Sequence, residues 1–479
     1  MSTSSFPTLR ITRDTLQPQG AFAVAQASFL SPEPRTVEDL ERICRDNHIG
    51  VVAHFYMDAE LQGVLTACAW PHIHIADSLK MADAAVTMDE AGMTTIVVLG
   101  VEFMSENVRA VLDAAGHEAV AVYRLAEAEI GCSLAESAEQ AAYDAFLHRA
   151  AAAENALHVV YINTSLQTKA QAHSIVPTIT CTSSNVVQTL LQADAQIPGV
   201  QIFYGPDTYM GHNLQTMLAQ FSQLSDDAIA AIHPAHDRAS IEALLGRFQT
   251  FEHGNCVVHH MFGSDVVRRV REEHADAFHT AHLEVPGEMF ELAVAAQTEG
   301  RGVVGSTSNI LGFITDKVRE AAAAGAPERP LSFVLGTEAG MVTAIVEKVR
   351  HELAAATPDL AVEIVFPVAS DAVAAAPDSS DLAIIPGVQG GEGCSTAGGC
   401  ATCPYMKMNS LDSLLDVLEG VAADGSHAAG LKGFRPKTYT ARIQGRTAAD
   451  IGSEPILHMR HFQKHGELPQ ALVDDVQSR

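Results

Sequence analysis

VVAHFY, residues 51–56, is a short apolar run that ends in polar side chains, and this pattern decides the fold. The same kind of run returns as VVYINTS (159–165) and as HTAHLE (279–284). Continuous apolar and β-branched residues are typical of strands that are buried on both faces of a parallel sheet. Because similarity that recurs along a chain indicates repeated structural units, we predict three copies of one α/β unit around a common centre.

A second set of repeated features follows each of these runs. A turn rich in Ser or Thr comes first, and another apolar run that contains glycine comes next. Helix-like stretches separate the runs, and strands that alternate with helices predict parallel sheets. Residues 140–155 and 222–240 are predicted as linkers. The turns are ADSL (76–79), TSSN (182–185) and GSTSN (305–309), and the second runs are VVLGVEF (97–103), IFYGPD (202–207) and FVLGTEAG (333–340).

Composition and charge exclude several classes of partner. The formal net charge of −28 argues against binding to nucleic acid or to an anionic membrane surface, because both need a basic patch. The N-terminus has no apolar core of a secretory signal, and no window is apolar for long enough to span a membrane. We therefore predict a cytoplasmic protein, in which the eight cysteines are thiols or metal ligands rather than disulfides.

Each third of the chain has one cysteine within two residues of glycine or proline. These residues are Cys132 in GCSLA, Cys256 in GNCVVH and Cys403 in ATCPYM, and the last segment also holds Cys394 and Cys400. A Cys-x-x-Cys-Pro element is typical of iron–sulfur ligation. A structural zinc site and a set of inert buried thiols are the alternatives that this spacing leaves open.

Thiolates that converge from three repeats indicate a particular kind of metal centre. Three thiolates can hold three irons of a cubane and leave the fourth iron with an open position. Such an iron acts as a Lewis acid on carboxylate, carbonyl or hydroxyl oxygen, whereas a pure electron carrier favours four cysteines. The pattern therefore points to chemistry on an oxygenated acid.

Polar residues at the turns and strand ends are the candidates for substrate binding. Ser78, Ser183 and Thr307 lie in the three turns, where a hydroxyl is an ordinary helix N-cap or, with the backbone N–H groups, an anion site. Ligands of parallel sheets bind beyond the carboxyl ends of the strands, and His, Tyr and Glu move protons near neutral pH. The residues at these strand ends are His54, Tyr56, Tyr161, Asn163, His259, His282 and Glu284.

Twelve short motifs occur in a fixed order between about residues 50 and 410. They are AHFYMDAELQ, ADSLKMA, GVEFMSENV, GCSLA, YINTS-x-x-x-KA, TSSNVV, PD-x-x-x-G, GNCVVH, H-x-E, VVGSTSNI, GTEAGM and CPYMKMN. Several are weak singly, but their combination is specific, and together they resemble the quinolinate synthase family.

The resemblance implies three similar α/β units with parallel sheets, in a pseudo-three-fold triangular arrangement around a central cluster site. It implies that Cys132, Cys256 and Cys403 bind a [4Fe–4S] cluster, while Cys394 and Cys400 are not expected to be ligands. The domains expected on this basis are an N-terminal extension (1–37), a first α/β domain (38–140), a second (141–262), a third (263–390), a cluster-binding segment that returns to the first domain (391–425), and a C-terminal extension (426–479).

The same resemblance implies the roles of the site residues. His54, Tyr56, His282 and Glu284 are expected to be catalytic. The family's usual His-Pro-Glu is His-Leu-Glu here, which gives the backbone at Leu283 more freedom. The substrate-binding residues are expected to be His54, Ser78, Tyr161, Ile162, Asn163, Ser183, His259, His282, Leu283, Glu284 and Thr307.

The expected activity is the condensation of iminoaspartate with dihydroxyacetone phosphate to quinolinate, phosphate and water, in the de novo synthesis of NAD. A transient contact with an L-aspartate oxidase, the source of iminoaspartate, is a further partner to consider. Two alternatives remain at this point. One is an aconitase-like iron–sulfur hydro-lyase, and the other is a non-catalytic iron–sulfur or zinc protein.

Overall fold

The computed structural model describes residues 6–325, 329–355, 360–367 and 402–479, and these form two compact units that are each discontinuous in sequence. The first unit contains Met1–Gly100, Ala119–Ile130 and Val257–Arg435, and the second contains Val101–Glu118, Gly131–Cys256 and Pro436–Arg479.

The first unit contains a four-stranded parallel sheet in the order β4-β3-β5-β6. All residues of the two central strands are buried, as expected for strands that helices cover on both faces. Asp58 and Asp77 are the N-caps of α3 and α4, because each side chain accepts a hydrogen bond from a backbone N–H of the first turn. The elements are α2 (Pro34–Asp46), β3 (Ile49–His54), α3 (Ala59–Ala67), β4 (Ile73–Ala76), α4 (Ser78–Glu90), β5 (Thr95–Leu99), β6 (Ala121–Arg124) and α17 (Leu411–Asp424).

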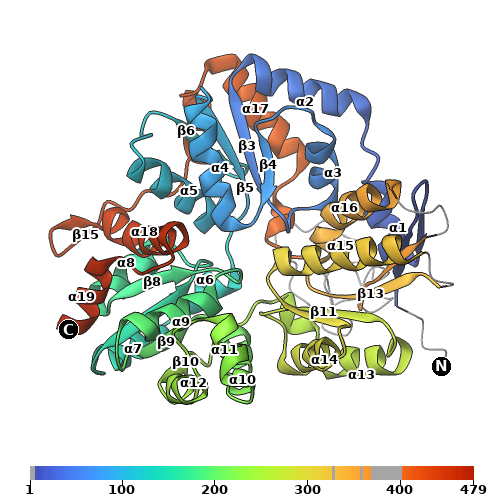
Figure 1. Cartoon of the computed structure of the whole chain (residues 1–479). Helices are drawn as coiled ribbons and strands as arrows, with labels where there is room; N and C mark the ends of the chain where they lie inside the picture. The colour runs from blue at the N-terminus through green and yellow to red at the C-terminus, as the bar shows by residue number, and fades with distance from the viewer. Residues whose placement is uncertain (1–5, 326–328, 356–359, 368–401) are drawn as a thin grey trace. The chain divides into compact units, whose positions relative to one another are not determined.

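The first unit also contains a six-stranded sheet in the order β12-β11-β13-β14-β1-β2. The four strands from β12 to β14 are parallel, whereas β1 and β2 are antiparallel additions. Helices α15 and α16 cover one face of this sheet, and α13 and α14 cover the other (Figure 1). The elements are β1 (Thr8–Ile11), β2 (Leu16–Gln19), α1 (Ala21–Ser28), α13 (Ser264–Glu273), β11 (Phe278–His282), α14 (Gly287–Thr298), β12 (Gly302–Gly305), α15 (Thr307–Ala324), β13 (Leu331–Gly336), α16 (Val342–Ala354) and β14 (Val362–Val365).

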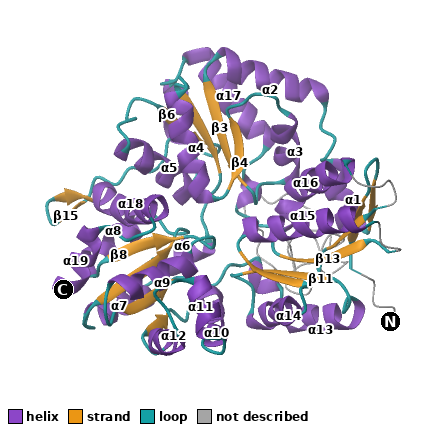
Figure 2. Cartoon of the chain, in the orientation of Figure 1, coloured by secondary structure: helices purple, strands orange, loops and turns teal. Residues whose placement is uncertain are grey.

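The second unit is built on a parallel sheet in the order β10-β9-β7-β8. Helices flank the strands of this sheet, as Figure 2 shows with helices in purple and strands in orange. The elements are α5 (Glu102–Ala114), α6 (Ser133–Ala138), α7 (Ala141–Ala151), β7 (Ala156–Tyr161), α8 (Leu166–Ile175), β8 (Thr178–Cys181), α9 (Val186–Gln196), β9 (Gln201–Gly205), α10 (Thr208–Phe221), α11 (Asp226–Ile232), α12 (Arg238–Leu245), β10 (Phe248–Thr250), β15 (Arg442–Ile443), β16 (Arg446–Thr447), α18 (Ala448–His465) and α19 (Gln470–Ser478).

The three parallel sheets share one strand order. Among the four parallel strands of each sheet, the first along the chain lies between the second and the third, and the fourth is next to the third. The prediction of an α/β fold with similar parallel sheets is therefore confirmed for the described residues. Their triangular three-fold arrangement and the domain boundaries stay predictions.

Both predicted extensions take part in these sheets and helices. The segment predicted as an N-terminal extension supplies β1, which pairs with β14 from Thr8 opposite Val365 to Ile11 opposite Val362. In the segment predicted as a C-terminal extension, Pro436–Arg479 belongs to the second unit, where α18 packs on α8 and β8.

Two other expectations are wrong. The stretches 140–155 and 222–240 are not simple linkers, because they contain α7 and α11. In α7 the apolar residues Tyr143, Phe146, Leu147 and Ala150 recur at helical spacing and are buried.

Among the described residues, no helix combines the length and the apolarity that crossing a membrane requires.

Candidate active site

Four of the predicted site residues of the first unit lie at the carboxyl ends of parallel strands. His54 is the last residue of β3, and His282 is the last residue of β11. Ser78 and Thr307 are the first residues of the helices that follow β4 and β12. All four are buried. This is the edge of a parallel sheet at which ligands bind.

Tyr56 connects the ends of the two sheets within the first unit. Its hydroxyl lies 3.1 Å from Oγ1 of Thr307 and 3.3 Å from Oγ1 of Thr337. Its ring packs edge-on against the His54 ring, with 4.8 Å between centroids. Burial raises the pKa of Tyr56 well above its usual value, and the nearby carboxylates of Glu338 and Glu284 act in the same direction. The hydroxyl therefore stays protonated and can donate a hydrogen bond.

His54 is held as a neutral imidazole. Burial lowers its pKa to about 4, and Asp77 and Glu284 oppose this only in part. Its Nδ1 atom accepts a hydrogen bond from the backbone N–H of Tyr56 at 3.1 Å. Because Nδ1 is the acceptor, the proton of the neutral ring is on Nε2, which makes that nitrogen a donor.

His259, His282 and Glu284 form a deeply buried part of the candidate site. The two imidazole rings stack, with 4.9 Å between centroids and 9° between planes. The Oε2 atom of Glu284 lies 2.7 Å from Nδ1 of His259 and 3.7 Å from Nδ1 of His282. Burial lowers the pKa of His282 to about 3 despite the attraction of Glu284, so His282 is neutral and able to accept a proton.

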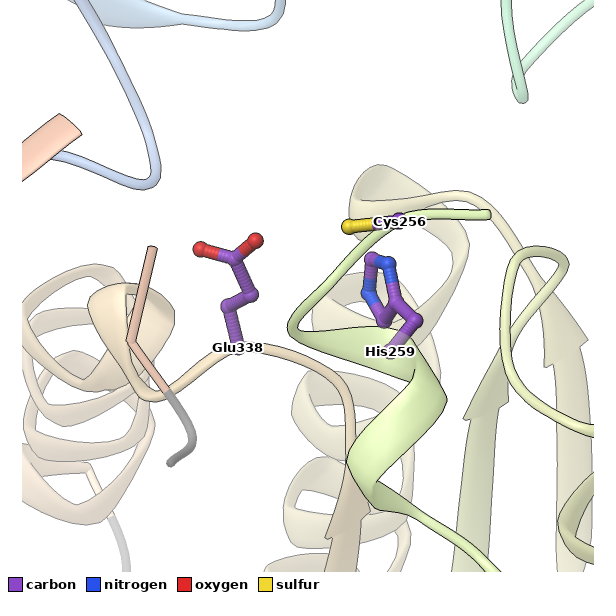
Figure 3. A group of neighbouring side chains, drawn as sticks. All are labelled: Cys256, His259 and Glu338. Atoms are coloured by element: carbon purple, nitrogen blue, oxygen red, sulfur yellow. The ribbon is translucent and has the colours of Figure 1, made fainter. Parts of the chain in front are cut away.

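Two groups of donor atoms in the described residues are close enough to hold a metal ion. In one, the donor atoms of His259, His282 and Glu284 lie within 4.8 Å of one another. In the other, the same limit holds for Cys256, His259 and Glu338 (Figure 3). Cys256 is the residue at which the chain passes from the second unit to the first. His259 belongs to both groups, and its buried Nε2 atom has no hydrogen-bond partner in the part of the chain that the structure describes.

The substrate-binding residues predicted in the second unit lie at the ends of β7 and β8. Tyr161 ends β7, and the backbone N–H of Ile162 bonds to the carbonyl of Cys181 at the end of β8, at 2.8 Å. Asn185 fixes the turn that contains Ser183, because its Oδ1 atom accepts from the N–H of Thr182 at 2.8 Å. The structure thus brings Tyr161, Ile162, Asn163 and Ser183 to one edge of this sheet.

Two of the three predicted cluster ligands lie on adjoining segments of the second unit. Ser133, next to Cys132, donates a hydrogen bond from Oγ to the carbonyl of Asn255, next to Cys256, at 3.1 Å. Gly254, just before this segment, passes close to the end of β9, since a Cβ atom there would lie 2.1 Å from the Pro206 carbonyl oxygen. Both cysteines are half-buried, as is Cys403.

Cys403 lies in the first unit, just before the 3₁₀ turn η4 (Met406–Met408). Asn409 anchors this turn to the end of β5, because its Nδ2 atom donates to the Gly100 carbonyl at 3.2 Å and its Oδ1 atom accepts from the Gly100 N–H at 3.3 Å. Cys394 and Cys400 lie outside the described residues.

Sequence reasoning did not select some residues that the structure places at these strand ends. Thr337 and Glu338 follow β13, and Asp77 precedes α4 next to Ser78. The signal for Thr337, Glu338 and Asn409 was present in the motifs GTEAGM and CPYMKMN. Leu283 is buried, and its backbone N–H is taken up by the Gly305 carbonyl at 3.1 Å.

We expect the free energy of unfolding to decrease as the pH falls from about 7 to about 5. The lowered pKa values of His54 and His282 mean that the unfolded chain, with a pKa near 6.5, binds protons that these buried rings do not bind. The stability that depends on the neutral rings is fully present above the unfolded pKa and is lost as the pH falls toward the folded values. At about pH 5, each ring should lower the free energy of unfolding by up to about 2 kcal/mol.

Urea denaturation at the two pH values measures this effect. His54→Gln should reduce the pH dependence, because the replacement cannot be protonated in either state. An unchanged difference between the two pH values in this variant would exclude the assigned role of His54.

A model of the quinolinate synthetase A protein family matches residues 38–426. "Quinolinate synthase, chloroplastic" of Nicotiana tabacum is 53% identical over 99% of the chain and 67% of the relative. The enzyme of that name from Arabidopsis thaliana is 54% identical over 99% of the chain and 67% of the relative. "Quinolinate synthase" of Prochlorococcus marinus is 27% identical over 61% of the chain and 70% of the relative. The chain spans about two thirds of the length of these plant relatives.

The names of the plant relatives contradict the predicted cytoplasmic location, because they assign those proteins to the chloroplast. The lack of an apolar core excludes only a secretory signal. Plastid transit peptides are amphipathic and rich in Ser and Arg, so the lack of such a core does not bear on them.

Proposed function

Because the chain belongs to the quinolinate synthetase A family and is an enzyme with quinolinate synthase activity, we propose that it condenses iminoaspartate with dihydroxyacetone phosphate, with loss of phosphate and water. The observation that carries this proposal is the gathering of His54, Tyr56, His282 and Glu284 at strand ends of one unit in a chain of this family. In accordance with the names of the plant relatives, we assign the activity to a plastid.

We propose that Cys132, Cys256 and Cys403 hold a [4Fe–4S] cluster. The adjoining segments of Cys132 and Cys256, and the half-buried position of all three thiols, fit this role better than the fully buried Cys44 and Cys181 do. When bound, such a cluster supplies a Lewis acid at its open iron, which polarises an oxygen of the substrate.

The other side chains bind the substrates and move protons in this proposal. Ser78 and Thr307 lie at helix N-termini, where backbone N–H groups and hydroxyls favour carboxylate or phosphate. His282 is neutral near pH 7 and serves as a proton acceptor, whereas Tyr56 and Nε2 of His54 serve as donors. Glu284 orients His259, and its negative charge stabilises a positive charge that forms on either imidazole.

The remaining predicted binding residues, Tyr161, Ile162, Asn163 and Ser183, are kept in the proposal as the substrate-binding edge of the second unit. Membership of the family disfavours both alternatives, since neither an aconitase-like hydro-lyase nor a non-catalytic protein is a quinolinate synthase. The contact with an L-aspartate oxidase stays a prediction.

Protein that is purified and assayed without oxygen tests this function. Incubated with iminoaspartate and dihydroxyacetone phosphate, it should form quinolinate and phosphate in equal amounts. Omission of dihydroxyacetone phosphate should stop both products. Iron-loaded protein that converts neither substrate would contradict the proposal, and dehydration of a hydroxy acid without release of phosphate would favour the hydro-lyase.

A further inference from the structure

Lys169, on α8, is a buried cation that the proposed reaction does not use. It is the lysine of the motif YINTS-x-x-x-KA, and its side chain is fully buried. Its Nζ atom donates to the carbonyl of Ile162 at 3.1 Å and to that of Thr164. Burying an ammonium is costly unless it is paired and hydrogen-bonded, so this lysine has a specific task. It holds the backbone of the turn that carries Asn163.

Glu106, on α5, is the anion that faces Lys169. It is buried as well, and its Oε2 atom accepts a hydrogen bond from the backbone N–H of Leu166 at 2.8 Å. Burial raises the pKa of Glu106 and lowers that of Lys169, each to about 7, and the attraction between the two groups opposes both shifts. Glu106 and Lys169 therefore hydrogen-bond to the two ends of the same turn, at Leu166 and at Ile162.

The C-terminal segment completes this arrangement. Tyr439 donates a hydrogen bond from its hydroxyl to Oε1 of Glu106 at 2.7 Å. The backbone N–H of Lys437 bonds to Oε1 of Glu102, one turn earlier on α5, at 3.1 Å. On α18, a Cβ atom at Gly452 would lie 2.2 Å from the carbonyl oxygen of Leu166, so this helix packs directly on the start of α8.

We infer that Tyr439, Glu106 and Lys169 form a positioning network through which the C-terminal segment fixes the substrate-binding turn from Tyr161 to Asn163. The inference rests on the proposed function for the identity of that turn. The family model ends at residue 426, whereas the plant relatives align over 99% of the chain. The C-terminal part of the network thus lies beyond the part of the chain that defines the family. These are positioning residues, since they act on substrate only through the turn.

Tyr439→Phe removes one hydroxyl and nothing else from this network. We expect KM for the substrate held by the turn to rise about tenfold, because a hydrogen bond to a carboxylate is among the stronger ones. We expect kcat to change less than about twofold, since the proton-transfer groups are untouched. Hydrogen exchange in the protein without substrate should increase in peptides that cover residues 161–168 and nowhere else in the second unit.

Tyr143→Phe is the matched control. The Tyr143 hydroxyl lies 2.8 Å from Nε2 of His158, so this variant also loses one short buried hydrogen bond in the second unit, away from the turn. It should lower thermal stability without a change in KM. If Tyr439→Phe behaves in the same way, the network is structural only and the inference is overturned.

Glu106→Gln is a second variant in case Tyr439→Phe does not fold. The amide keeps the shape and can still bond to Leu166 and Tyr439, but it removes the charge that faces Lys169. A rise in KM with unchanged kcat supports the inference, and unchanged KM and exchange overturn it. Protein that makes no quinolinate at all would contradict the proposed function. Hydrogen exchange in residues 161–168 would still decide whether the network orders the turn.

Discussion

Single replacement of Cys132, Cys256 or Cys403 by Ser should remove the iron–sulfur absorption of the protein and lower quinolinate formation by at least about a hundredfold. The physical reason is that a thiolate is the ligand that iron in such clusters requires, and a serine hydroxyl stays protonated near neutral pH. The three sites are expected to be equivalent in this test, because each thiol would hold one iron. Iron and sulfide content after anaerobic purification, together with the initial rate, measures the effect.

Cys68→Ser provides the control for this series. Cys68 is half-buried like the three proposed ligands, and its Sγ atom bonds to the carbonyl of Val64 at 3.2 Å, a bond that a serine hydroxyl can also make. This variant should keep its iron and its activity. Full iron content and activity in any one of the three other variants would remove that cysteine from the ligand set.

Glu284→Gln should lower kcat by about a hundredfold or more with a much smaller change in KM, as is typical for the loss of a group that supports proton transfer. Glu284 is only 3% exposed, and its carboxylate faces both His259 and His282. The amide has the same shape but carries no charge to stabilise a protonated imidazole. The variant should retain its iron, which separates this effect from loss of the cluster.

The exposed Glu288, four residues later at the start of α14, supplies a matched Glu→Gln control with no contact to the imidazole pair expected. Glu288→Gln should be as active as the unmodified protein. A kcat within about threefold of normal in Glu284→Gln would exclude this carboxylate from the proton-transfer chemistry.

The sheets were predictable because their strands are continuous apolar runs that end in recognisable polar residues. His54 and His282 could be placed at strand ends from the sequence for this reason, and the structure has both there. The edge strand β2 was not predictable. The residues of β2 are LQPQ, and Pro18 within a short polar run argues against a strand except at a sheet edge, which is where β2 lies.

Helix α18 of the second unit was not predictable for a related reason. Pro455 lies inside α18, where local rules predict a break, but its side chain is buried against the rest of the unit. The pairing of Tyr439 with Glu106 joins residues that are far apart in sequence, and no local pattern reveals such a contact. The lowered pKa values of His54 and His282 likewise result from burial, and the apolar pattern of the sequence does not give the degree of burial.

The pairing of β1 with β14 has a consequence for how this protein folds during its synthesis. Strand β1 is synthesised about 350 residues before its partner β14, an interval on the order of half a minute. During that interval Leu9 and Ile11, which are buried in the finished sheet, lack most of their core cluster, because its larger part lies after residue 300. Pairing between strands so far apart in sequence slows folding and leaves apolar residues of β1 exposed in the meantime. We therefore expect chaperones to bind the nascent chain at the hairpin of β1 and β2.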